Sequence, residues 1–242
     1  MELTHDDILE NYAELFGVDD GATVKLITDS ISQLYKEWNI FLYFFCGPRE
    51  RVDVLNESSG STARTLQSML WDSAVMKVRK LTDPAKSRSN KNLSIENLVR
   101  IAFDHSKLDI SGSYETTMAE VTDCRKYADK YLVHRDLGHA LGKSATSINR
   151  KSTTLAIRAI GSFVKTFHME TRDTQYALMP ISFAADEQQF LMRLHLGNLK
   201  SKELEAERYA RAISGEKVEK LEYRLPEWIR DDESRHPLFD LD

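Results

Sequence analysis

The chain has 242 residues, of which 41% are hydrophobic and 29% are charged, and its formal net charge is −5. This composition is typical of a folded globular protein and argues against wholesale disorder. The acidic balance does not indicate a general nucleic-acid binder, although a local basic patch can still bind RNA. The two cysteines, Cys46 and Cys124, exclude a disulfide framework and fit a reducing compartment.

The N-terminal segment has early acidic residues and no long apolar run, so it does not look like a signal peptide. No stretch reaches the ~18 consecutive apolar residues that indicate a membrane-spanning helix. We therefore expect a soluble, cytoplasmic protein with no membrane partner.

Apolar residues three and four positions apart predict helices along the whole chain. The predicted helices cover residues 4–16, 23–45, 62–81, 113–131, 155–168 and 185–196. Glycine, proline and small polar residues predict connections over 46–61, 82–92 and 142–152. A further helix is expected after Ser94, its predicted N-cap, and ends before Gly112.

No segment alternates polar and apolar residues convincingly enough to predict a strand. Short connections between long helices favour an all-α, antiparallel helical bundle. The highly charged segment 199–213 looks helical, and the acidic end of the chain looks like a loose tail. We therefore expect a bundle over residues 1–197 and a charged helical extension over 198–242.

A basic stretch begins near the end of the third predicted helix. It reads KVRKLTDPAKSRSNK and has one acidic residue, Asp83, against six cations: Lys77, Arg79, Lys80, Lys86, Arg88 and Lys91. Such a segment can bind RNA phosphates, but more often it is a solvated surface.

The stretch CRKYADKYLVHRDLGHALGKS, from Cys124 to Ser144, combines histidines with many charged residues. His134 and His139 are five residues apart, about 140° around a helix, which is a poor spacing for two metal ligands. No cysteine or acidic cluster completes a metal shell, so we expect neither a metal nor another cofactor. Cys124 lies on the apolar stripe and is expected to be a core residue.

The segments LTDP, NLSIENL and YADKYLVHRD together resemble the abortive-infection AbiU-type branch of the HEPN superfamily. The resemblance covers roughly residues 30–170 and implies an all-α bundle that commonly pairs as a dimer. Active members are typically metal-independent ribonucleases whose motif is an arginine, then four to six intervening residues, then a histidine. The resemblance also implies RNA and an antitoxin or another defence-system protein as partners.

The resemblance assigns the catalytic histidine to His134, with Lys130 and Asp136 in the matching lysine and acid positions. Asp129 stands where an asparagine is usual, and Ala128 stands where the arginine is expected. The candidates for the missing cation are Arg125, one helical turn before Ala128, and Arg135. Two interpretations stay open: a ribonuclease with a degenerate motif, or a non-catalytic HEPN module that binds RNA or protein.

The sequence NIFLYFF, at the end of the second predicted helix, suggests where two copies could meet. Its aromatic residues cannot all lie on one buried helix face: Phe41, Tyr43, Phe44 and Phe45. We therefore expect a homodimer formed partly by this helix end or by the motif helix. Coverage of these side chains by the C-terminal helices of the same chain is the alternative.

Overall fold

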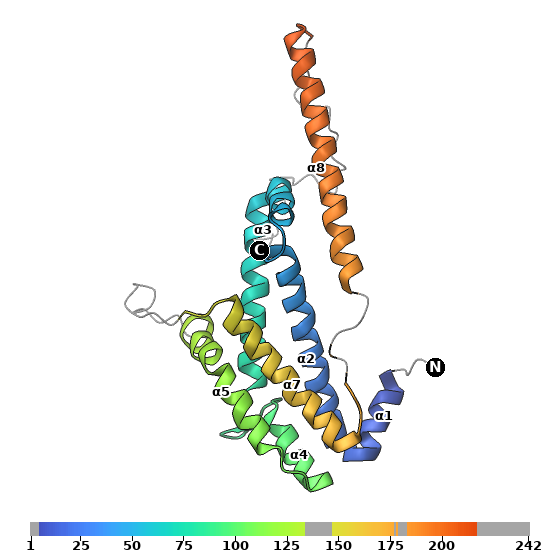
Figure 1. The fold of residues 1–242 in the computed structure, drawn as a ribbon, viewed down its shortest axis with the longest axis vertical. Helices are drawn as coiled ribbons and strands as arrows, with labels where there is room; N and C mark the ends of the chain where they lie inside the picture. Colours follow the sequence, from blue (N-terminus) through green and yellow to red (C-terminus); the bar gives the residue numbers. More distant parts are fainter. Residues whose placement is uncertain (1–4, 134–146, 177, 179–182, 217–242) are drawn as a thin grey trace, which may run out of the picture. The chain divides into compact units, whose positions relative to one another are not determined.

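A computed structural model describes residues 5–133, 147–176, 178 and 183–216. These residues form seven α-helices, one π-helix and one two-stranded hairpin (Figure 1). In chain order the elements are α1 His5–Phe16, α2 Val18–Phe45, α3 Arg49–Leu81, β1 Lys86–Ser87, β2 Asn90–Lys91, α4 Glu96–Ser106, α5 Ser111–Tyr127, η1 Ala128–Val133, α7 Arg150–Arg172 and α8 Phe183–Ile213. The predicted all-α fold is confirmed.

The chain divides into two units, residues 1–194 and 195–242. Within the first unit, α1 packs on α2, α2 packs on α3, and α5 packs on α7 (Figure 1). Helix α4 contacts α1, α2, α5 and α7, so it closes one end of this bundle. The second unit begins within α8, and the predicted boundary at 197/198 stays a prediction.

The core of the first unit consists of the apolar stripes of its helices. Its largest fully buried side chains include Ile27, Ile31 and Leu34 of α2 and Phe163 and Phe167 of α7. A side chain at Gly161 would collide with the hydroxyl of Tyr35, so this glycine allows α7 to lie close to α2.

The predicted connection over 46–61 is wrong, because α3 already begins at Arg49. Pro48 precedes the helix with φ −54°, a value that suits a helix start. The predicted break survives only as a kink at Ser59, whose backbone is non-helical (φ −168°, ψ 95°). The break signals Gly47, Pro48 and Gly60 only flank residues 49–58, which include the strong helix formers arginine, glutamate and leucine, and Leu55 packs with Phe44 in a second apolar cluster.

Two smaller predictions also differ from the structure. The cap of α4 is Ile95, not Ser94, and the side chain of Asn97 donates to the carbonyl oxygens of Asn92 and Ser94 (2.8 and 3.1 Å). The predicted loop 82–92 contains the β1–β2 hairpin, in which Lys86 lies opposite Lys91.

Helix α7 begins at Arg150, earlier than predicted, because Asn149 and Ser152 form a capping box. The Asn149 side chain accepts from the Ser152 amide, and the Ser152 hydroxyl accepts from the Asn149 amide, both at 3.0 Å. Two satisfied backbone groups fix this helix start after the segment that carries the motif.

The aromatic end of α2 packs partly against α8. Phe44 lies 5.6 Å from Phe190, centroid to centroid, and shares a buried cluster with Leu55, Ala63 and Leu191. Residues of the chain itself therefore cover part of the surface that the sequence suggested for a homodimer.

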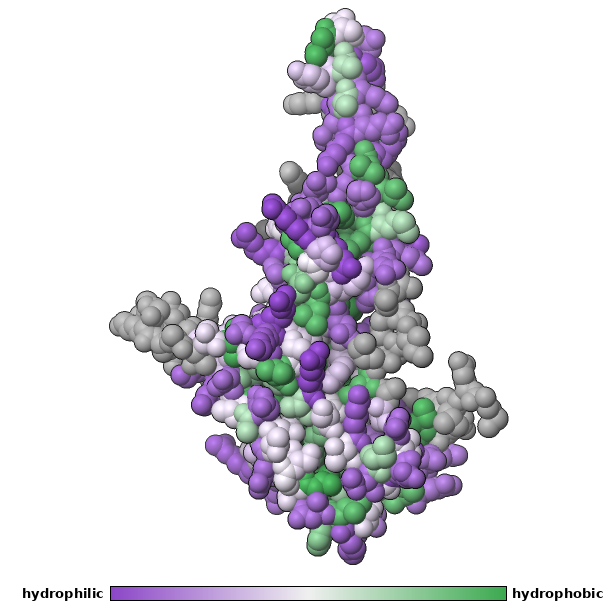
Figure 2. All heavy atoms as spheres, in the orientation of Figure 1, coloured by the Kyte–Doolittle hydropathy of each residue, from purple (hydrophilic) through white to green (hydrophobic). Residues whose placement is uncertain are grey.

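The visible face of the molecule is largely hydrophilic, with hydrophobic residues in small separate patches (Figure 2). Within the described part of the chain, no helix is long and apolar enough to cross a membrane.

Candidate RNA-binding and catalytic site

The motif segment begins in a π-helix. Helix α5 ends at Tyr127 and continues as η1, Ala128–Val133, directly before His134. A π-helical turn is rare and is found frequently at functional sites, because it redirects the side chains that follow it. Tyr127 and Tyr131 stack across this change of pitch, with centroids 4.2 Å apart.

Ala128 is the residue at which the resemblance led us to expect the motif arginine. Its side chain is fully buried, and Val121 and Cys124 are buried on the preceding turns of α5. Ala128 therefore continues the buried apolar stripe of α5 into η1. A guanidinium group at this position would lie in the protein interior.

Two arginines and two aspartates form a charged cluster around η1. Arg79 of α3 donates from Nε to Oδ1 of Asp129 at 2.6 Å, and its Nη1 atom pairs with Asp83. Arg125 of α5 approaches the same Asp83 carboxylate, with Nη2 3.8 Å from Oδ1. The cluster thus joins the end of α3 to the motif helix, although these segments are about 50 residues apart in sequence.

Arg125 is the less satisfied of the two guanidinium groups. Its side chain is 22% exposed, and its Nη1 atom is buried without an acceptor among the described residues. Burial, and then the neighbouring charge of Arg79, lowers the pKa of Arg125, which still carries its charge at neutral pH. A buried cation with an unused donor has an electrostatic preference for an added anionic acceptor.

The predicted catalytic residues fall into two groups. Arg125, Asp129 and Lys130 are described: Arg125 and Asp129 belong to the charged cluster, and Lys130 is exposed on η1. His134, Arg135 and Asp136 lie outside the described residues, as does His139.

The six predicted RNA-binding cations do not form one uniform patch. Lys77 and Arg79 are half-buried and paired with acidic residues, whereas the others are exposed: Lys80, Lys86, Arg88 and Lys91. Lys77 pairs with Glu37 of α2, which also accepts from Gln33 and Ser73 (both 2.9 Å). Burial would raise the pKa of Glu37, but these hydrogen bonds outweigh it and hold the pKa below its usual value.

Sequence reasoning did not identify Asp83 and Glu37 as partners of these cations. Asp83 follows Arg79 by four residues, and this spacing is a readable signal for a helical ion pair. Glu37 lies 40 residues before Lys77, and its pairing carries no local signal.

Cys124 is a buried core residue, 1% exposed, and burial raises the pKa of its thiol to about 11. Over the described ranges, no group of three or more histidine, cysteine or acidic side chains is arranged to hold a metal ion.

The family model HEPN_AbiU2, described as AbiU2, matches residues 21–184. This match covers α2 to the beginning of α8 and includes the charged cluster and the motif segment. The chain has no match among curated proteins and none among solved structures. Because the model spans well over half of the sequence, the chain belongs to the AbiU2 family, the abortive-infection AbiU-type branch of the HEPN superfamily.

Proposed function

We propose that this HEPN protein is a metal-independent endoribonuclease of a phage-defence or toxin–antitoxin system. The observation that carries the proposal is Arg125, a largely buried cation with an unused donor, at the start of the segment that leads to His134. It supplies the positive charge that Ala128 lacks.

The proposed reaction is cleavage of RNA by its own 2′-hydroxyl. His134 takes the proton of this hydroxyl, the oxygen attacks the adjacent phosphorus, and the bond to the 5′-oxygen breaks as that oxygen takes a proton from water. The products are a 2′,3′-cyclic phosphate and a 5′-hydroxyl, and His134 returns its proton to the solvent. Histidine suits this role because it exchanges protons near neutral pH. The charge of Arg125 stabilises the phosphate as negative charge develops in the transition state.

We infer supporting roles for the other residues of the motif. Asp129 holds Arg79 against η1, Lys130 and Arg135 contribute positive charge for binding the RNA backbone, and Asp136 is the trailing acid of the motif. Arg135 is the second candidate for the cation that faces the phosphate. Comparing the cleavage rates of an Arg135 variant and an Arg125 variant shows which of the two has this role.

The test is cleavage of a fluorescent single-stranded RNA by the purified chain in the presence of a chelator. We expect His134→Ala to lower the rate by ~10²–10⁴-fold, the usual contribution of proton transfer. Arg125→Gln should also lower it by ~10²-fold or more, the usual effect of losing one charge-stabilising group. Arg158→Gln, a change at an exposed arginine of α7, is the matched control. Cleavage that persists after His134→Ala contradicts the proposal.

A non-catalytic HEPN module that binds RNA or protein is the second candidate. It is favoured by the neutralisation of Arg79 by Asp83 and Asp129, which leaves less charge for a transition state. For this candidate we expect RNA binding without cleavage, and His134→Ala should bind RNA with the same affinity as the wild type.

The proposed partners are a second copy of the chain and an antitoxin or another defence-system protein. A homodimer would bring two motif segments to one cleft, as two-fold symmetry allows. Light scattering at micromolar concentration tests it, and a monomeric mass contradicts it.

A further inference from the structure

A pocket of about 480 Å³ lies between α2 and α3, and the two arginines and two aspartates of the charged cluster do not line it. Its volume is within the ~300–1,000 Å³ typical of small-molecule sites. Residues from α2, the end of α3 and the segment after β2 line it: Asp29, Ser30, Gln33, Lys77, Lys80, Leu81 and Leu93. Lys80 follows Arg79 directly, so the two side chains leave α3 about 100° apart.

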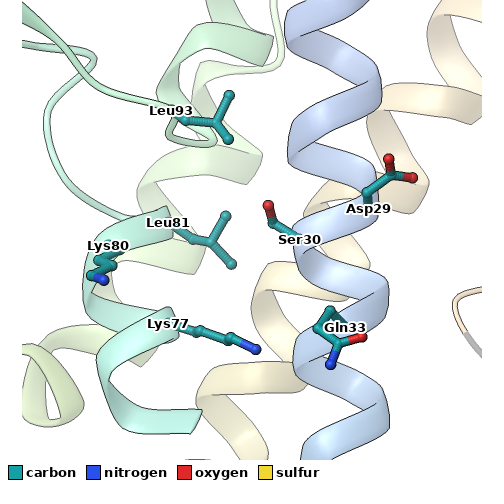
Figure 3. A pocket seen from close by; sticks show the side chains of 7 residues that line it. All are labelled: Asp29, Ser30, Gln33, Lys77, Lys80, Leu81 and Leu93. Atoms are coloured by element: carbon teal, nitrogen blue, oxygen red, sulfur yellow. The ribbon is translucent and has the colours of Figure 1, made fainter. Parts of the chain in front are cut away.

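The walls of this pocket combine an apolar surface with fixed polar groups. Leu81 and Leu93 point into the gap from one side, and Ser30 of α2 points into it from the other (Figure 3). Lys77 extends across the gap toward Gln33. Because Gln33 donates from Nε2 to Glu37, its amide oxygen is the group that a ligand can use as an acceptor.

The pocket adjoins the basic β1–β2 hairpin. Leu93 follows β2, and the hairpin is closed by a 2.8 Å hydrogen bond from the Asn92 amide to the Ala85 carbonyl. Lys86 and Lys91 are direct cross-strand neighbours, and no acidic side chain among the described residues pairs with either one. Like charges placed opposite each other repel, so an anion bound between them is stabilising.

We propose that this pocket holds one nucleotide of a single-stranded RNA. The flat base packs against Leu81 and Leu93, with its polar edge toward Gln33 and Lys77. The flanking phosphates contact Lys80, at the outer edge of α3, and the hairpin cations Lys86 and Lys91. Unstacked bases held in pockets beside basic grooves are a usual mode of single-strand recognition.

This inference rests on the proposal that the protein acts on RNA, but it does not require cleavage. A free nucleotide presents the same chemistry as a nucleotide within a strand. The two sources differ in the phosphates that flank the base, and these are what the hairpin would contact.

The first experiment fills the pocket. In the His134→Ala background, which prevents cleavage, we measure the anisotropy of a labelled single-stranded RNA with Ser30→Leu. We expect the Kd to rise about tenfold, because loss of one base contact is worth ~1–3 kcal/mol. Ser162→Leu places the same side chain at an exposed serine of α7 and should bind as the parent does. Thermal unfolding of both variants verifies that they are folded.

The second experiment separates phosphate contacts from base contacts by salt. Lys80→Gln and Lys86→Gln should each reduce the slope of log K against log salt by ~0.7, the value for one phosphate on a single strand. Ser30→Leu should weaken binding without changing the slope. Lys165→Gln, at an exposed lysine of α7, is the charge control and should leave both quantities unchanged.

The outcomes distinguish this inference from the proposed function. If Ser30→Leu binds RNA as tightly as its control, the pocket does not hold a base and the inference is overturned, even where the wild type cleaves RNA. If Ser30→Leu binds more weakly and the wild type never cleaves RNA, the pocket stands and the ribonuclease proposal fails. Competition by a free nucleoside monophosphate, lost in Ser30→Leu, supports a base-binding pocket. If Lys80→Gln and Lys86→Gln then leave the salt slope unchanged, flanking phosphates are not bound and the RNA-strand inference is overturned in favour of a free nucleotide. A wild type that binds neither RNA nor nucleotide overturns the inference.

Discussion

The guanidinium group of Arg79 in α3 donates a 2.6 Å hydrogen bond from Nε to the carboxylate of Asp129 in η1. This contact joins the basic end of α3 to the first turn of the motif segment. Because Nη1 of Arg79 also pairs with Asp83, both carboxylates reduce the positive charge that this arginine offers to a phosphate. Asp129 stands where the resemblance to the family implied an asparagine, and this acidic residue has Arg79 as its structural partner.

Asp129→Asn should increase RNA affinity and cost little stability. The amide oxygen can still accept from Arg79, while loss of the negative charge strengthens the attraction of phosphate. Since Asp129 is 45% exposed, we expect the free energy of unfolding to fall by less than ~1 kcal/mol. Urea unfolding and RNA anisotropy measure the two effects. Asp123→Asn, at an exposed acid of α5, is the control, and weaker RNA binding by Asp129→Asn would contradict this role.

The buried His168 side chain should make the free energy of unfolding depend on pH. The ring is fully buried between Tyr12, Phe167 and Tyr176, and Nε2 lies 3.2 Å from the hydroxyl of Thr28. Burial, and then the charge of Arg172, lowers the pKa of His168 to about 4.

In the folded state the His168 ring therefore takes up a proton only at lower pH, whereas in the unfolded chain it takes one up near pH 6.5. Stability should fall as the pH drops from about 6.5 to about 4, by ~3 kcal/mol from this residue. Unfolding in urea across this range measures the slope. His168→Phe keeps an aromatic ring among its neighbours and cannot titrate, so its slope should be smaller. An equal slope in both proteins would assign the acid sensitivity to other groups.

The two cysteines should differ sharply in reactivity. Cys124 is 1% exposed, and its thiol has a pKa of about 11 because it is buried, so little reactive thiolate forms at pH 8. Cys46 is half-buried at the end of α2 and is more accessible. Mass spectrometry after brief alkylation should find one adduct on the native chain and two in denaturant. Rapid native modification of Cys124 would mean that α5 opens readily.

Much of the fold could be predicted because helical periodicity is a local property of the sequence. The three- and four-residue spacing correctly predicted the buried stripe of α7 and the first part of the stripe of α2, Ile27, Ile31, Leu34 and Trp38. At the end of α2 it did not: Leu42 and Phe45 are half-buried, and Phe41 and Phe44 are buried in their place. Residues 49–58 could not be predicted in the same way. The flanking Gly47, Pro48 and Gly60 indicated a break, while the helix formers between them and the burial of Leu55 with Phe44 favour a helix.

The candidate site could be predicted only in part. Because position 128 is an alanine and not the expected arginine, the sequence indicated Arg125, one helical turn earlier, as a candidate cation. The pairings of Arg79 with Asp129 and of Lys77 with Glu37 join residues 50 and 40 positions apart, and no spacing rule reports them. As a result, the sequence grouped six cations that the structure separates into paired and exposed sets.

Ala128→Arg should fail to restore the usual motif. Ala128 is fully buried, so the new guanidinium would displace apolar packing and lose its hydration. A buried charge without a partner costs ~3–5 kcal/mol, enough to unfold a large fraction of a marginally stable domain. Thermal unfolding and circular dichroism should therefore report a much less stable protein, and cleavage of RNA should fall with the folded fraction.

Ala128→Ser, which adds one small polar atom at the same position, is the control and should lose far less stability than the arginine variant. If Ala128→Arg instead melts near the wild-type temperature and cleaves RNA faster, the interior beside η1 can open to admit a guanidinium. Arg125 would then not be the substitute for the missing arginine. The double variant Ala128→Arg, Arg125→Gln distinguishes the two cases. It should be inactive if Arg125 contacts the phosphate, and active if the arginine introduced by Ala128→Arg takes over this contact.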